Sequence, residues 1–119
     1  MPFIPGMHKR IRPPKPVVAV LRTRPETVVD DYRRLVHLAG VADALDPAVQ
    51  TILKDNITWH LVHPGVNTTP WQLEGTILGL RDHGFADLVD VHNHTVVTDP
   101  HVGEKNLRFR PVYDRYDIP

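Results

Sequence analysis

Histidine is the residue type in this sequence with the greatest capacity for chemistry, at 8 of 119 positions. His92 and His94 are separated by one residue, directly after residues 88–91, which the sequence predicts to form a strand. Residues two apart on a strand face the same side, so both imidazoles can reach one ion. The spacing predicts a divalent-metal site, with nickel, zinc or copper as the ions that imidazole suits. His101, on a loop with Asp99, is a candidate further ligand.

His60 and His63 form a weaker pair, because residues three apart on a strand point to opposite faces. Only a loop conformation would bring these two rings to one ion. The plain alternative for all of these histidines is a solvated or hydrogen-bonded loop position. His8, His37 and His83 have no partner at a useful spacing, and we expect them at the surface.

A second set of polar residues predicts binding of an anion. Lys54 and Asn56 follow a short apolar run, and Thr68 and Thr69 come directly before a helix that a proline opens. A helix N-terminus offers free amides and a partial positive charge, which suits a phosphate or a carboxylate. Lys54 would add a point charge, and the two hydroxyls would add donors. The plain alternative for the same threonines is a helix cap without a ligand, which Thr-Pro-x-Gln forms in any protein.

Arg22 and Arg24 flank Thr23 shortly before another predicted helix. The two guanidinium groups would either clamp the same kind of anion or be solvated, and the sequence leaves both alternatives open.

Several kinds of chemistry are excluded by residues that the sequence lacks. There is no cysteine, so this chain offers no disulfide, no thiolate and no ligand for an iron–sulfur cluster. There is no serine, so the Gly-x-Ser-x-Gly nucleophile motif is absent. A phosphate-binding P-loop is also missing. The acidic residues near the predicted strands are too scattered to predict a carboxylate pair for acid–base catalysis: Asp87, Asp90 and Asp99.

Alternating strands and helices must position these side chains. Short apolar and β-branched runs predict strands over 17–21, over 51–54 with a continuation at 57–59, and over 88–91 with an extension at 96–97. Apolar residues at helical spacing predict helices over 25–39 and from Pro70 to Gly84. Residues 41–50 predict a connector or short helical turn, and residues 103–116 a helix broken by Pro111.

This order predicts an α/β fold: a small three-stranded, mainly parallel sheet with flanking helices, resembling part of a Rossmann domain. Ligands of open α/β sheets bind at the carboxyl ends of the strands, where the basic, amide and imidazole groups above would gather. Two or three helices are too few to cover both faces of a parallel sheet. We therefore expect the domain to be incomplete on its own, and to be completed by a second copy or by another chain.

Composition limits the partners. The chain has 14 basic and 14 acidic residues, which argues against a nucleic-acid surface. No apolar run approaches the roughly 18 residues of a membrane span, and the first residues lack the apolar core of a signal peptide. The sequence thus predicts a cytoplasmic protein. Residues 1–16 predict a proline-rich basic arm, and residues 17–119 the α/β domain.

Five segments carry a resemblance to a known family: Lys54-x-Asn56, Pro64-Gly65, Thr68-Thr69-Pro70-Trp71-Gln72-Leu73-Glu74, Asn93-x-Thr95-Val96-Val97-Thr98 and Arg110-Pro111-Val112-Tyr113-x-x-Tyr116. Together they resemble the N-terminal portion of the family called domain of unknown function 362 (DUF 362). That family is in turn distantly similar to the N-terminal domain of nickel-pincer lactate racemases. The family often has Lys-Pro-Asn where this chain has Asp55 as the middle residue. The ferredoxin-like cysteines of some members have no counterpart here.

Three functions remain open at this point. The first is a DUF 362-like domain that binds a small anionic molecule or cofactor, within an enzyme or outside one. The second is a histidine-based module for a divalent metal. The third is a structural or assembly subunit without chemistry of its own.

Overall fold

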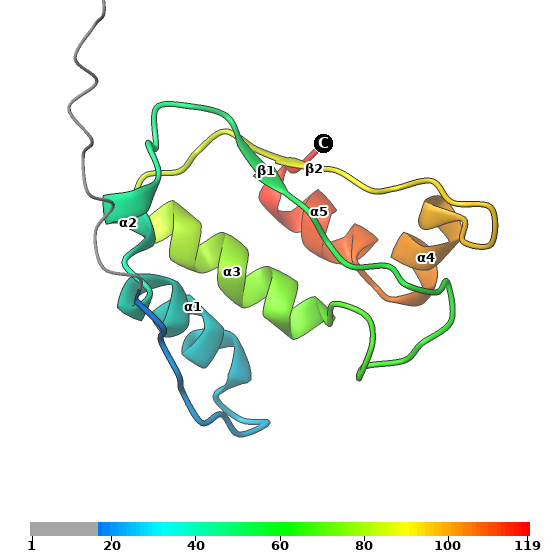
Figure 1. Cartoon of the computed structure of the whole chain (residues 1–119), viewed down its shortest axis with the longest axis horizontal. Helices are drawn as coiled ribbons and strands as arrows, with labels where there is room; N and C mark the ends of the chain where they lie inside the picture. The colour runs from blue at the N-terminus through cyan, green and yellow to red at the C-terminus, as the bar shows by residue number, and fades with distance from the viewer. Residues whose placement is uncertain (1–16) are drawn as a thin grey trace, which may run out of the picture.

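The computed structural model describes residues 17–119, so the predicted arm over 1–16, with His8, lies outside the described residues. The helices are α1 (Val28–Leu38), α2 (Val41–Ala44), α3 (Pro70–Asp82), α4 (Pro100–Asn106) and α5 (Arg110–Tyr116), and the strands are β1 (Thr51–Leu53) and β2 (Leu88–Asp90). Figure 1 shows their arrangement. Within these residues no helix is long and apolar enough to cross a membrane.

The sheet confirms the predicted parallel α/β order on a smaller scale. β1 and β2 pair in parallel, with Leu53 opposite Asp90. A bond from Val91 N to Leu53 O extends the ladder by one step beyond the strands. The predicted continuations were wrong, because 57–59 and 96–97 form no strand. Val96 and Val97 are instead exposed on a loop.

The predicted first strand over 17–21 was also wrong. This segment has no strand pairing within residues 17–119, and Val17, Val18 and Val20 are exposed. Only Ala19 and Leu21 are half-buried. Leu21 lies in a shallow hollow beside Tyr32 of α1. The apolar run is therefore partly buried against a helix and does not pair with neighbouring strands. The described sheet has two strands, not three.

Helix α3 begins and ends as predicted. The Thr69 side chain accepts a hydrogen bond from Gln72 N, and Pro70 occupies the first turn. Gly84 follows the helix with φ of 86°, a conformation that glycine adopts without strain. The predicted apolar face is buried, with Leu73 and Ile77 at its centre.

Helix α1 begins at Val28, later than the predicted residue 25, because Thr23 does not cap it. The Thr23 hydroxyl donates to Arg24 O instead. α1 packs directly against α3, and two glycines of α3 permit the close approach. A Cβ at Gly75 would lie 2.5 Å from Tyr32 Cβ, and one at Gly79 would lie 2.8 Å from Val36 Cβ.

The predicted broken helix over 103–116 is two helices with separate starts. Asp99 caps α4 by accepting from His101 N and Val102 N, and Pro100 occupies its first turn. The chain turns between the helices at Arg108, with φ of 64°. Pro111 therefore lies in the first turn of α5, where a proline needs no amide donor, and does not interrupt a helix.

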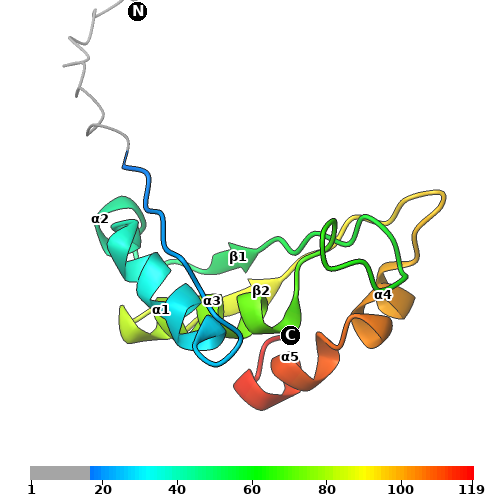
Figure 2. The ribbon, with the colours of Figure 1, turned by 90° about the horizontal axis from the view of Figure 1, so that it is seen from below.

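One side of the sheet is covered and the other is not. Figure 2 shows α3 and α5 on the same side of the two strands. Leu53 and Leu88 are buried towards these helices, whereas Ile52, which precedes Leu53 on β1 and points to the opposite side of the sheet, is 63% exposed. The other core residues come mainly from the helices and the C-terminal segment: Leu73, Ile77, Leu80, Phe85, Leu107, Phe109, Val112, Tyr113 and Ile118.

Candidate metal centre

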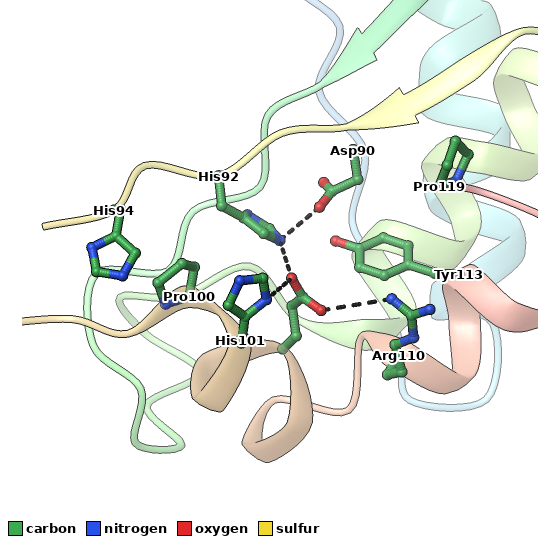
Figure 3. Close-up of a pocket in the computed structure, with 9 residues that line it drawn as sticks. Asp90, His92, His94, Pro100, His101, Arg110, Tyr113 and Pro119 are labelled. Carbon is green, nitrogen blue, oxygen red and sulfur yellow. Dashed lines mark ion pairs between the residues drawn. The ribbon is translucent and has the colours of Figure 1, made fainter.

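The carboxyl end of β2 delivers two metal-ligating side chains to one place. Asp90 is the last residue of β2, and His92 follows two positions later, so both point to the same side. Glu104 on α4 completes the group, and one ligand atom from each of the three residues lies within 4.8 Å of the others. Figure 3 shows the His92 ring turned towards Asp90.

Helix α4 fixes Glu104 at this point. Its start is set by the Asp99 cap, and Gly103 lets it approach the chain after β1 closely. A Cβ at Gly103 would lie 2.5 Å from Ile57 Cγ2, so only glycine fits without displacing that side chain. Glu104 comes directly after this contact and is only 14% exposed.

One of the two distances measured from His92 matches the spacing of ligands around an ion. His92 Nε2 lies 2.6 Å from Asp90 Oδ2 and 3.5 Å from Glu104 Oε1. A tetrahedral zinc ion with ordinary bonds separates its ligand atoms by roughly 3.3 Å. The Glu104 distance fits this spacing, and the Asp90 side chain would move outward slightly to reach it.

The side chains of the group are largely buried, yet three of their polar atoms lack hydrogen-bond partners in the described part of the chain. The side chains of Asp90 and His92 are 7% and 8% exposed. Within residues 17–119, Asp90 Oδ1 and both ring nitrogens of His92 have no hydrogen-bond partner. The short contact between His92 and Asp90 is an ion pair when His92 is protonated, whereas Asp90 Oδ1 and His92 Nδ1 have no partner within residues 17–119. Because buried polar groups are normally satisfied, these atoms call for a partner such as a cation.

Further charge surrounds the group. Burial acts to lower the pKa of His92, but the adjoining Asp90 carboxylate and the charges of Glu104 and Asp55 raise it above its ordinary value. Burial raises the pKa of Asp55, although a hydrogen bond from Tyr113 acts in the opposite direction. Three carboxylates, from Asp90, Glu104 and Asp55, thus act on a single imidazole, and a divalent ion would also be attracted by their negative charge.

A cavity of 390 Å³ opens beside the group. His94, His101 and Arg110 also line it. His101 Nδ1 lies 3.8 Å from Glu104 Oε1, but the side chain is 85% exposed. His94 is exposed and belongs to the cavity wall, not to the close group of ligand atoms. The structure therefore brings His92 together with Asp90 and Glu104 more closely than with His94.

Two of the predicted anion-binding residues line a second cavity, to which His92 also contributes. Lys54 and Asn56 line this space of 380 Å³ together with His92. Thr68 and Thr69 do not line it, because their hydroxyls are used locally: Thr68 Oγ1 accepts from Asn56 N, and Thr69 Oγ1 from Gln72 N. Lys54 Nζ donates to Asp55 O.

The remaining predicted residues lie elsewhere. Arg24 lines a hollow beside Trp71, away from Lys54 and Asn56, and Arg22 is exposed before α1. His60 and His63 both lie beside Trp59, with ring centroids 6.5 Å and 6.4 Å from that ring. Neither histidine belongs to the close group around His92.

Sequence reasoning missed Asp90 and Glu104 as candidate ligands. Asp90-x-His92 has the same spacing as His92-x-His94, so the rule that selected the histidine pair also applied to the aspartate. Asp99-Pro100 has the same features of a helix start as Thr69-Pro70, so the sequence could have predicted a helix that carries Glu104. Neither signal indicates how α4 folds back onto β2.

Comparison with protein families, with curated proteins and with solved structures found no match for this chain.

Proposed function

We propose that this chain is a binding domain for one divalent metal ion, held by Asp90, His92 and Glu104. The observation that carries the proposal is the clustering of three ligand atoms from Asp90, His92 and Glu104, together with the buried Asp90 Oδ1 and His92 ring nitrogens that lack hydrogen-bond partners among the described residues. The alternative is an ion pair between a protonated His92 and Asp90, which the 2.6 Å contact and the raised pKa of His92 also fit. Metal binding by the unchanged chain distinguishes the two.

The ligand set favours zinc among the ions that the histidines suggested. Zinc accepts imidazole nitrogen and carboxylate oxygen at similar distances and is commonly four-coordinate. Three protein ligands leave one position for water or a small molecule, which is typical of sites that act on a ligand. Nickel and copper also bind imidazole, and copper generally binds such sites more tightly than nickel or zinc does. A competition among the three ions belongs in the test for that reason.

Calorimetry on chelator-treated full chain tests the proposal. We expect one zinc ion per chain, and a loss of affinity of at least about 100-fold in Asp90→Asn and Glu104→Gln, since even residues behind the ligands cost 10–100-fold. His94→Ala is the matched control and should bind zinc as the unchanged chain does. Absence of zinc, nickel and copper binding would overturn the proposal. Loss of binding only in His94→Ala would assign the ion to the His92–His94 pair instead.

A second candidate function is binding of a small anion in the cavity that Lys54 and Asn56 line. The clustering of both residues at the carboxyl end of β1 supports it, as does the resemblance of Lys54-x-Asn56 to the DUF 362 motif. Inorganic phosphate should then raise the melting temperature of the chain, and Lys54→Ala should remove the rise. A rise that Lys54→Ala leaves unchanged would place the anion elsewhere.

A further inference from the structure

We infer that the metal site binds a small oxoanion, a carboxylate or a phosphate, between the ion and the guanidinium of Arg110. The inference rests on the proposed metal site. It adds the class of ligand that the open side of the site would take.

The cavity has room for such a ligand. Its volume of 390 Å³ far exceeds the roughly 30 Å³ that one water occupies in the liquid. Figure 3 shows Asp90, His92, His101 and Arg110 gathered around one space. Pro100 and Pro119 form apolar parts of the wall. The space thus suits a molecule with a charged head and a small apolar remainder.

The ion would have an open position towards this space. Only three residues of the described chain contribute to the close group of ligand atoms. Two carboxylates neutralise a divalent ion, and His92 is neutral when it acts as a ligand. An anion that fills the open position would therefore not have to overcome net negative charge at the metal centre.

The wall on the Arg110 side supplies donors. Arg110 Nη1 lies 4.0 Å from Glu104 Oε2, and Arg110 Nε lies 3.1 Å from Asp114 Oδ1. The guanidinium thus uses Nε for Asp114, while Nη1 lies on the side of Glu104 at the edge of the cavity, and the side chain is 61% exposed. A guanidinium offers planar paired donors that match the oxygens of a carboxylate or a phosphate. His101 adds an exposed imidazole at the cavity rim.

Cobalt(II) in place of zinc gives a direct readout, because its visible absorption reports the coordination of the ion. The full chain is loaded with cobalt(II) and titrated separately with acetate, inorganic phosphate and neutral acetamide. We expect a saturable spectral change with acetate or phosphate and none with acetamide. A change with acetate only identifies a carboxylate site, and a change with phosphate only a phosphate site.

Two variants test the part played by Arg110. Arg110→Gln should weaken anion binding about 10-fold or more while cobalt(II) still binds, since a charge-assisted pair is lost. Arg108→Gln is the matched control, because Arg108 is exposed and does not line the cavity. Bound cobalt(II) without any anion response overturns this inference alone, and so does a response that Arg110→Gln leaves unchanged. Failure of cobalt(II), zinc, nickel and copper to bind overturns the metal site and this inference together.

Discussion

Tyr113 on α5 donates a 2.6 Å hydrogen bond to Asp55 Oδ2, a buried carboxylate 58 positions earlier in the chain. The bond joins the end of β1 to the last helix, next to the candidate metal centre. Burial and the charge of Asp55 raise the pKa of Tyr113, so the phenol stays protonated and remains a donor. The C-terminal helix is thereby tied to the carboxyl end of the sheet by one polar contact within the core.

Removal of this donor should destabilise the chain. Tyr113→Phe leaves Asp55 buried without its partner, so we expect a loss of about 1–3 kcal/mol in the free energy of unfolding. Urea denaturation in the presence of a chelator measures the loss without any contribution from metal. Tyr116→Phe is the control, since its hydroxyl bonds Glu74 at 2.8 Å in a less buried place. Equal losses in the two variants would contradict the special role of the buried pair.

The contact between α1 and α3 predicts a strong effect of a single methyl group. Gly79→Ala places a Cβ against Val36 and Arg33 O, so the helices must separate. We expect a net loss of about 1–3 kcal/mol, even though alanine favours a helix more than glycine does. Gly65→Ala is the matched control, because a Cβ there meets nothing within 4 Å. Thermal unfolding of both variants should show a lower midpoint for Gly79→Ala alone.

The side chain of Asn67 should stabilise the conformation of the loop after β1. Its buried side chain accepts from Thr58 N and Trp59 N and donates to Trp59 O and Leu61 O. Asn67→Ala leaves these backbone groups without partners, and we expect a loss of about 2 kcal/mol or more. Hydrogen exchange should show faster exchange at Thr58 and Trp59.

Asn93→Ala is the control for that loss, because Asn93 is exposed and should change stability by less than about 0.5 kcal/mol. Unchanged exchange at Thr58 in Asn67→Ala would show that the loop is held by other contacts.

Local signals in the sequence were sufficient for the parts of the fold that short-range chemistry determines. Thr69-Pro70 predicted the start of α3, and the spacing of His92 and His94 predicted His92 as a candidate metal ligand. The apolar run 17–21 failed as a strand because pairing depends on a neighbouring strand, which no local pattern reveals. Glu104 was missed for a similar reason, since its proximity to His92 depends on how α4 folds back over the end of β2.

The ion pair between Arg33 and Asp82 should make stability depend on pH. Arg33 Nη2 donates to Asp82 Oδ1 at 2.7 Å, which joins α1 to the end of α3. The hydrogen bond from Arg33 holds the pKa of Asp82 below its ordinary value. The unfolded chain therefore takes up this proton at higher pH than the folded chain does. The stabilisation is complete above about pH 3.9, the ordinary value for aspartate, and is lost as the pH falls through the lowered pKa.

Both side chains are 44% exposed, so the effect at neutral pH should be small and reduced by salt. Asp82→Asn should lower the urea midpoint at pH 7, and its difference from the unchanged chain should shrink towards pH 3. Arg33→Gln should behave in the same way. The double variant should lose less than the sum of the two single losses, because the partners stabilise the chain through one shared interaction. Additive losses that persist at pH 3 would mean that each residue acts through separate contacts.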